Sequence, residues 1–295
     1  MMNCTGTLLA LMLAGLVACG TVPGRSASTG STAGSAGGTE ASTAGTTSAG
    51  YAGNAAVVAD TPDVDLPSLT GPPAAAARDN AVGVVAAGGP LLPSGWEPWI
   101  LHPAKPLTTY RLERRGSGLA MRADADSSAS GLLTMMRADP TRRPFLEWRW
   151  RVDELISGAD NTDRHAEDAP VRIVLAFDGD KSSLPMKDRL FFEQMRLFSG
   201  RDLPYATLMY IWENNKPVGT VIRNPNTDRV RKIVVASGAS ELQRWCSFRR
   251  NIVEDYKMAY GMAPGKLVAV AILTDTDNTK QSATAWYGDI KLLRH

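Results

Sequence analysis

Residues 267–293 constrain the fold of this chain more than any other stretch. They read LVAVAILTDTDNTKQSATAWYGDIKLL, which is an apolar run, a polar turn and a second run of β-forming residues. Runs rich in Val, Ile and aromatic residues that end at turn residues are typical of strands. We therefore predict two strands here, joined by an acidic turn that carries Asp275, Asp277 and Asn278.

A second stretch, PFLEWRWRVDEL, alternates apolar and charged residues. Period two is typical of a half-buried strand, so Trp148 and Trp150 should point inward and the charged residues outward. Two interpretations of the outward face remain open. We favour a solvated ladder of charges, and the alternative is that Glu147, Arg149 and Arg151 line a concave sheet face.

Short strand-like runs separated by Gly, Ser, Asp and Pro recur between residues 91 and 295, without the strand–helix alternation of a parallel sheet. Residues 186–198 (MKDRLFFEQMRLF) are the clearest helix, and residues 245–260 mix strand and helix character. We predict a mainly β domain over residues 91–295. Its expected architecture is an antiparallel β-sandwich of the jelly-roll type with one or two short helices.

The N-terminus predicts export. Residues 8–17 (LLALMLAGLV) have the length of a signal-peptide core and are too short to span a membrane. The residues up to Cys19 resemble the lipobox of bacterial lipoproteins, although MMNCTGT before them has no Lys or Arg. The resemblance implies that residues 1–18 are a lipoprotein signal peptide and that Cys19 carries lipid, including palmitate. Gly20 resembles outer-membrane members, and an uncleaved membrane anchor is the alternative.

Residues 19–90 are rich in Gly, Ser, Thr, Ala and Pro and show no hydrophobic periodicity. Such a composition cannot bury a core, so we predict a disordered tether. A flexible coil of about 70 residues spans on the order of 45 Å, which would hold the domain clear of the lipid headgroups.

Composition and motifs exclude several classes of function. The net charge of +2 argues against a nucleic-acid binder, which needs a concentrated basic face. The chain has no G-x-G-x-x-G, P-loop, H-E-x-x-H or G-x-S-x-G motif. Cys246 lacks a histidine at a recognisable spacing, so we expect a small buried side chain there. The oligomeric state is not predicted.

Three polar clusters are the candidates for chemistry. Asp275, Asp277 and Asn278 offer oxygen ligands for a hard cation such as calcium. Calcium is the one cofactor that we consider, and our expectation is that the protein has no cofactor. The favoured interpretation is a turn that locks strands 267–274 and 283–293 together. Asp168 and Arg172 form the second cluster, with Arg149 or Arg151 beside them.

The third cluster is Arg250, Asn251 and Asp255, close in sequence to Trp245, and Trp212 is a further aromatic candidate. Aromatic faces beside charged groups suit sugar rings, although such pairs are also common in salt bridges of the core. The candidate ligand-binding residues are Asp168, Arg172, Arg149, Arg151, Trp212, Arg250, Asn251 and Asp255.

The folded part resembles a bacterial family of exported proteins, the domain-of-unknown-function family numbered 3047. The resemblance lies in SSASGL at 127–132, LEWRWRVD at 146–153, EDAPVR at 167–172, LPYATLMYIW at 203–212, RNIVEDY at 250–256, LTDTDNT at 273–279 and AWYGDI at 285–290. It implies a β-sandwich-like domain of the cell envelope and carries no established activity. Glu167 and Asp168 stand where the family has paired aspartates.

Three functions remain open. The first is a lipid-anchored, non-catalytic envelope domain that binds a glycan or other polar ligand. The second is a carbohydrate-active hydrolase or lyase, which needs two carboxylates across a cleft. The third is a structural or interaction domain. A groove with an exposed aromatic side chain favours the first two, whereas polar clusters buried in mutual salt bridges favour the third.

Overall fold

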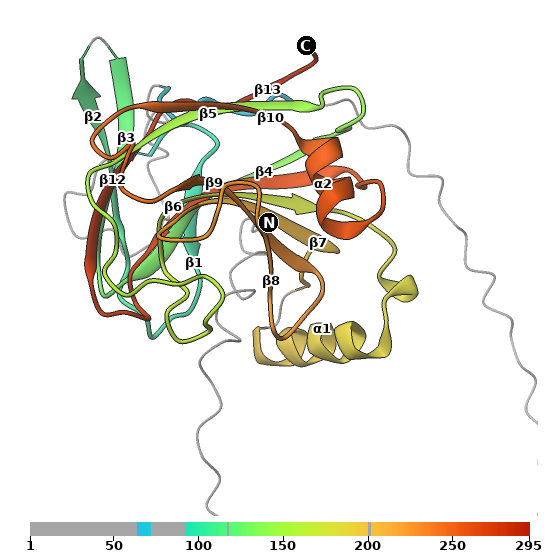
Figure 1. The fold of residues 1–295 in the computed structure, drawn as a ribbon. Helices are drawn as coiled ribbons and strands as arrows, with labels where there is room; N and C mark the ends of the chain where they lie inside the picture. The colour runs from blue at the N-terminus through green and yellow to red at the C-terminus, as the bar shows by residue number, and fades with distance from the viewer. Residues whose placement is uncertain (1–63, 72–91, 117, 200–201) are drawn as a thin grey trace, which may run out of the picture. The chain divides into compact units, whose positions relative to one another are not determined.

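The computed structural model describes residues 64–71, 92–116, 118–199 and 202–295 (Figure 1). The predicted signal peptide, Cys19 and most of the predicted tether lie outside these residues. The described part contains two β-sheets and two α-helices. No helix in these ranges is long and apolar enough to cross a membrane.

The larger sheet has seven strands, in the order β1-β4-β11-β6-β7-β9-β8. Their bounds are β1 Glu97–Ile100, β4 Ala129–Ala138, β11 Leu267–Asp275, β6 Ala169–Phe177, β7 Ala206–Glu213, β9 Val230–Ser237 and β8 Val221–Arg223. Every residue of β6 (APVRIVLAF) is buried, because a central strand covered on both faces needs an almost continuous apolar run. All neighbouring strands are antiparallel except β7 and β9, which are parallel.

The second sheet has the order β10-β5-β12-β3-β2, and β13 also pairs with β5. Its strands are β10 Cys246–Asn251, β5 Phe145–Val152, β12 Ser282–Tyr287, β3 Gly118–Asp126, β2 Thr109–Arg115 and β13 Lys291–Leu293. The predicted alternation of β5 is confirmed, since Trp148 and Trp150 are buried whereas Arg149 is exposed.

Aromatic side chains join the inner faces of the two sheets. Trp148 of β5 stacks on Tyr210 of β7, with 4.9 Å between ring centroids, and on Phe248 of β10 at 5.1 Å. Most of the buried apolar residues of both sheets form one continuous cluster. The prediction of a mainly β fold is therefore confirmed. The jelly-roll type is not established, and the parallel pair of β7 and β9 departs from a wholly antiparallel sandwich.

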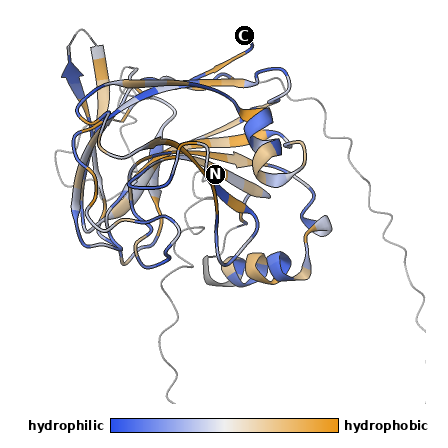
Figure 2. Cartoon of the chain, viewed as in Figure 1, coloured by the Kyte–Doolittle hydropathy of each residue, from blue (hydrophilic) through white to orange (hydrophobic). Residues whose placement is uncertain are grey.

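Two helices accompany the sheets. The predicted helix is confirmed as α1 (Met186–Ser199), which shows a mixture of polar and apolar residues in Figure 2 and buries Phe192 and Met195. The mixed stretch that follows Trp245 divides into β10 and α2 (Ile252–Tyr260). Asn251 caps the start of α2, and Gly261 ends it at a φ of 72°, a left-handed conformation that glycine adopts without strain.

The final strands correct one prediction. β11 lies in the larger sheet and β12 in the second, so residues 276–281 cross between sheets and do not close a hairpin. The turn therefore does not lock these two strands together as neighbours. Asx-rich turns serve hairpins and inter-sheet connections equally well, and the pairing partners of β11 and β12 lie far away in the sequence.

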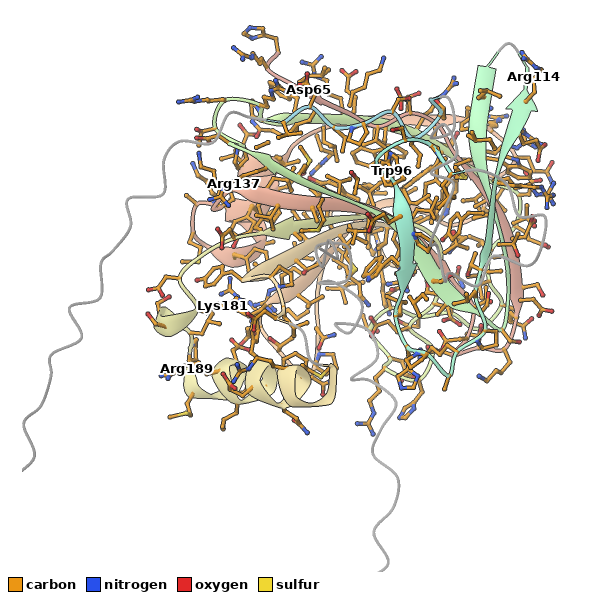
Figure 3. All side chains as sticks on the ribbon, turned by 180° about the vertical axis from the view of Figure 1, so that it is seen from behind. Asp65, Trp96, Arg114, Arg137, Lys181 and Arg189 are labelled. Atoms are coloured by element: carbon orange, nitrogen blue, oxygen red, sulfur yellow. The ribbon has the colours of Figure 1, made fainter. Side chains whose placement is uncertain are left out.

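Residues 64–71 fall within the predicted tether, yet they pack on the domain. Leu69 is fully buried, and the carbonyl of Pro67 accepts a hydrogen bond from Trp96 Nε1 at 3.1 Å. Asp65 pairs with Arg143, and Figure 3 labels both Asp65 and Trp96. The predicted boundary at residue 90 is therefore wrong for this segment, because scattered apolar residues without periodicity can still anchor a chain to a surface.

Candidate functional site

A cluster of charged residues lies buried at the larger sheet. Arg172 of β6 is fully buried, and its Nη2 donates to both carboxylate oxygens of Asp275 on β11 at 2.9 Å. Arg172 Nη2 also donates to the carbonyl oxygen of Glu167 at 2.8 Å. Arg172 therefore forms its ion pair with Asp275 and not, as expected, with Asp168.

Asp168 instead closes the acidic turn. Its carboxylate accepts hydrogen bonds from the backbone N–H of Asn278 and from the N–H and hydroxyl of Thr279, at 3.2, 2.7 and 2.6 Å. Asp277 pairs with Lys105 at 2.6 Å. The acidic turn is therefore fastened to the chain just before β6, which agrees with a bracing role although the braced elements differ from those predicted.

The prediction missed Lys232, Asn161 and Glu213, which complete this buried charge network. Lys232 Nζ lies 2.5 Å from Glu167 Oε1 and donates to Asn161 Oδ1 at 3.1 Å. Burial lowers the pKa of Lys232 to about 8. Glu213 accepts a hydrogen bond from the N–H of Asn161 at 2.8 Å. A lysine inside the apolar strand VRKIVVAS was the available signal, because a buried lysine needs a charged partner.

Carboxylate oxygens of Asp168, Asp275 and Asp277 lie within 4.8 Å of one another, close enough for one cation to contact all three. Their present partners include Arg172 and Lys105. A metal ion would have to compete with these two cations for the same oxygens. The side-chain amide of Asn278 donates to the carbonyl of Arg164 at 2.9 Å.

We expect the stability of the folded protein to depend on pH because of the Asp275 carboxyl group. Burial raises its pKa from 3.8 to about 7, against the opposing effect of Arg172. Between about pH 4 and about pH 7 the folded protein therefore holds a proton that the unfolded chain has released. The free energy of unfolding should fall as the pH rises, by up to about 1.4 kcal/mol per pH unit.

Urea unfolding of the wild type and of Asp275→Asn across this range tests the prediction, since the variant lacks the titrating group. We expect the slope with pH to be shallower in the variant. Parallel pH profiles of the two proteins would contradict the assignment to Asp275.

The third predicted cluster joins β10, α2 and β7. Arg250 Nε and Nη2 contact the two oxygens of Asp255 at 2.9 and 2.5 Å, and the Tyr210 hydroxyl donates to the same carboxylate at 2.7 Å. Burial raises the pKa of Tyr210 well above its usual value. Asn251 accepts hydrogen bonds from Val253 and Glu254 as the cap of α2. These contacts hold the fold together.

Trp212 is a core residue, since it is 1% exposed and its Nε1 donates to the carbonyl of Gly238 at 3.1 Å. Its burial leaves no ring face for a ligand. Cys246 is a free, partly exposed thiol that packs against the core, and burial raises its pKa. The side chain is therefore not buried as expected, although the raised pKa makes the thiolate scarcer and does not favour a nucleophilic role.

An open groove lies on the outer face of the second sheet, over β5, β10 and β13, which Figure 1 shows side by side at the top. Its volume is about 500 Å³. Its lining residues come from three strands, the β12–β13 link and the 64–71 segment: Thr70, Glu147, Trp148, Arg149, Ser247, Phe248, Arg249, Asp289 and Lys291. The concave sheet face was the less favoured interpretation of the sequence.

The groove lining carries a small excess of positive charge, with Arg149, Arg249 and Lys291 against Glu147 and Asp289. Glu147 pairs with Arg249 at 3.1 Å across β5 and β10. Among the described residues, Arg149 and Lys291 form no ion pair, and the Arg149 guanidinium lies over the ring of Trp245 at 4.8 Å. Trp245 is partly exposed and does not line the groove itself, but its contact with Arg149 places an aromatic ring beside it.

Asp289 and Gly288 shape the groove. Asp289 Oδ1 accepts hydrogen bonds from the Ser68 hydroxyl and the Leu69 N–H at 2.9 and 3.0 Å, which holds the 64–71 segment beside it. A Cβ on Gly288 would lie 2.4 Å from Cγ of Arg149, so a larger residue there would force the Arg149 side chain to move. Arg151 lies outside the groove lining and pairs with Asp153 at 2.8 Å.

Comparison with known families agrees with the predicted resemblance. The model of a family described as "Protein of unknown function (DUF3047)" matches residues 94–291. A search of curated proteins finds no match. The matched range begins just before β1 and ends at the start of β13, so it includes both helices and nearly all of both sheets. The chain therefore belongs to the DUF3047 family.

Proposed function

We propose that this protein is a non-catalytic envelope domain that binds a glycan or other polar ligand in the groove over β5, β10 and β13. The observation that carries the proposal is the pair of cations, Arg149 and Lys291, that line a groove of about 500 Å³ without a carboxylate partner among the described residues. Their charge favours a ligand with acidic groups.

The neighbouring side chains suit a sugar. The ring of Trp245, next to Arg149, can take the apolar face of a pyranose, while Thr70 and Ser247 offer hydroxyl groups to its hydroxyls. Asp289 and Glu147 can accept hydrogen bonds from a sugar in addition to those they accept from the protein. An oligosaccharide with carboxylate or sulfate groups is therefore the ligand class that best matches the groove.

The sequence supports a location of this domain in the cell envelope. The lipobox resemblance at Cys19 and the Gly/Ser-rich stretch after it support a lipid anchor in the outer membrane and a flexible connection to it. Such an arrangement would present the groove to glycans near the membrane. A calcium ion at Asp168, Asp275 and Asp277 remains a second ligand hypothesis, supported by the 4.8 Å grouping of their oxygens.

A hydrolase or lyase is the second candidate function. Glu147 and Asp289 are two carboxylates that line the same groove, as glycoside hydrolysis requires. Both are engaged, however, because Glu147 pairs with Arg249 and Asp289 holds the 64–71 segment. Incubation of bound oligosaccharides with the protein distinguishes the two functions, since only an enzyme releases shorter products.

A glycan array probed with the full chain, without its lipid, tests the binding proposal. We expect binding to acidic oligosaccharides. Arg149→Gln and Trp245→Ala should each weaken binding roughly tenfold or more, because each removes a direct contact of about 1.5 kcal/mol. Addition of calcium or of a chelator should leave binding unchanged if the groove alone holds the glycan.

Arg151→Gln is the matched control, since Arg151 lies on the same strand and is paired with Asp153 away from the groove lining. It should bind as the wild type does. Equal binding by wild type, Arg149→Gln and Trp245→Ala would reject the groove as the binding site, and the third function, a structural or interaction domain, would then be favoured.

A further inference from the structure

A second cluster of basic residues lies where β9 meets α2. Arg229 precedes β9 directly and Arg231 lies within it, so their side chains point to the same side of the extended backbone. Both guanidinium groups lie over the ring of Tyr260 on α2, at 5.0 and 5.7 Å. Arg229 also lies over Tyr205 at 4.2 Å. The two arginines are only 8% and 6% exposed.

Few of the hydrogen-bond donors of this cluster are used. Arg229 Nε donates to the carbonyl of Tyr205 at 3.1 Å, and Arg231 Nη2 pairs with Asp228 at 3.1 Å. Within the part of the chain that the structure describes, four further buried N–H and O–H groups have no acceptor, although the Tyr256 hydroxyl lies close enough to the Arg229 guanidinium to be affected by its charge. These are Arg229 Nη2, Arg231 Nε, Arg231 Nη1 and the Tyr256 hydroxyl.

Unpaired donors on a buried cation are unusual. A guanidinium that leaves water loses the hydrogen bonds of its N–H groups, and a protein normally replaces them with carboxylates or carbonyls. Tyr260 and Tyr205 stabilise the positive charge through their ring faces, but ring faces leave the N–H groups in the guanidinium plane unpaired. The unpaired N–H groups of both arginines therefore favour a further acceptor that joins them.

The acids near this cluster do not fill that role. Asp228 reaches a single nitrogen of Arg231 and is 56% exposed. Asp188 on α1 accepts hydrogen bonds from the Thr227 hydroxyl and the Asp228 N–H at 2.7 and 3.0 Å, and it forms no ion pair with either arginine among those described. The contact with exposed Asp228 also shows that the cluster lies directly beneath the surface.

We propose that Arg229, Arg231 and Tyr256 form a binding site for a tetrahedral oxyanion, a phosphate or sulfate group. Its oxygens only accept hydrogen bonds, and the planar fork of an arginine presents paired donors to such a group. Tyr256 acts as a neutral donor, since burial raises its pKa to about 12. The site is separate from the groove and does not depend on the proposed glycan binding.

Thermal unfolding of the full chain in chloride, phosphate and sulfate at equal ionic strength tests this site. We expect phosphate and sulfate to raise the melting temperature of the wild type. Arg231→Gln and Arg229→Gln should lose this gain, because each removes charged donors and weakens anion binding roughly tenfold or more. In chloride the variants should be less stable than the wild type, because they lose the contacts with Tyr205, Tyr260 and Asp228, so the gain is measured against each variant's own melting temperature in chloride.

Arg196→Gln is the control, because Arg196 is an exposed arginine of α1 that pairs with Glu193, and it should keep the full gain. Tyr256→Phe removes one hydroxyl and should reduce the gain without loss of folding. Glycerol phosphate and vesicles that contain phosphatidylglycerol distinguish a phosphate ester and a lipid headgroup from the free ion. No gain in any of these arms, or an equal gain in wild type, Arg229→Gln and Arg231→Gln, would overturn the proposal.

Discussion

Replacement of Arg172 by methionine should lower the free energy of unfolding by about 3–5 kcal/mol at slightly alkaline pH, where Asp275 is ionised. Arg172 is fully buried and contacts Asp275 and the Glu167 carbonyl. The variant leaves the Asp275 carboxylate in a dry environment with no cation bonded to it. Urea unfolding followed by circular dichroism measures the change. At about pH 5 the loss should be smaller, because Asp275 then takes up a proton.

Two comparisons make this prediction specific. Arg151→Met removes a partly exposed arginine that is paired with Asp153, and it should change stability by no more than about 1 kcal/mol. The double variant Arg172→Met with Asp275→Leu should lose less than the sum of the two single losses, because no buried charge remains unpaired. A loss below about 1 kcal/mol in Arg172→Met would show that the buried charge network is not needed for folding.

Trp148→Ala should also destabilise the protein by about 3–5 kcal/mol, the usual range when a large aromatic side chain is removed from a core. Trp148 is 3% exposed and stacks on Tyr210 of the opposite sheet and on Phe248 of the neighbouring strand. Its removal opens a cavity between the two sheets. Denaturant unfolding should show a lower midpoint for this variant.

Trp245→Ala is the matched control, since it removes the same side chain from the partly exposed position beside Arg149. It should cost little stability, within about 1 kcal/mol, and its effect should appear in ligand binding instead. Comparable destabilisation by the two substitutions would mean that Trp245 is part of the core, which would weaken its proposed role in ligand binding.

The comparison of β5 with residues 276–281 shows which parts of the fold were predictable. The period-two pattern of β5 identified its inward tryptophans and outward charges, because that alternation is a local property of an extended chain. The acidic turn was also recognised. Its role as a crossing between sheets was not, since the partners of β11 and β12 are distant residues and no local pattern records them.

For the candidate sites, too, the residue types were predictable from the sequence and the pairings were not. Asp168, Arg172, Asp275 and Asp277 were chosen for their residue types, and the fold gathers them into one network. The actual pairing of Arg172 with Asp275 depends on the register of β6 against β11. Trp212 was chosen as an aromatic ligand contact and is core, because aromatic residues in strands serve both purposes.

Local patterns in the chain therefore determined the β class, the helix α1, the inward face of β5 and the residue types of the polar clusters. Tertiary structure alone decided that β11 and β12 separate into two sheets, that Lys232 and Glu213 join the buried charge network, and that Arg149, Lys291 and the 64–71 segment meet at one groove. The physical reason is the distance along the chain over which each effect acts. Propensity and periodicity act over a few residues, whereas ion pairs and grooves depend on packing between residues that are a hundred or more positions apart.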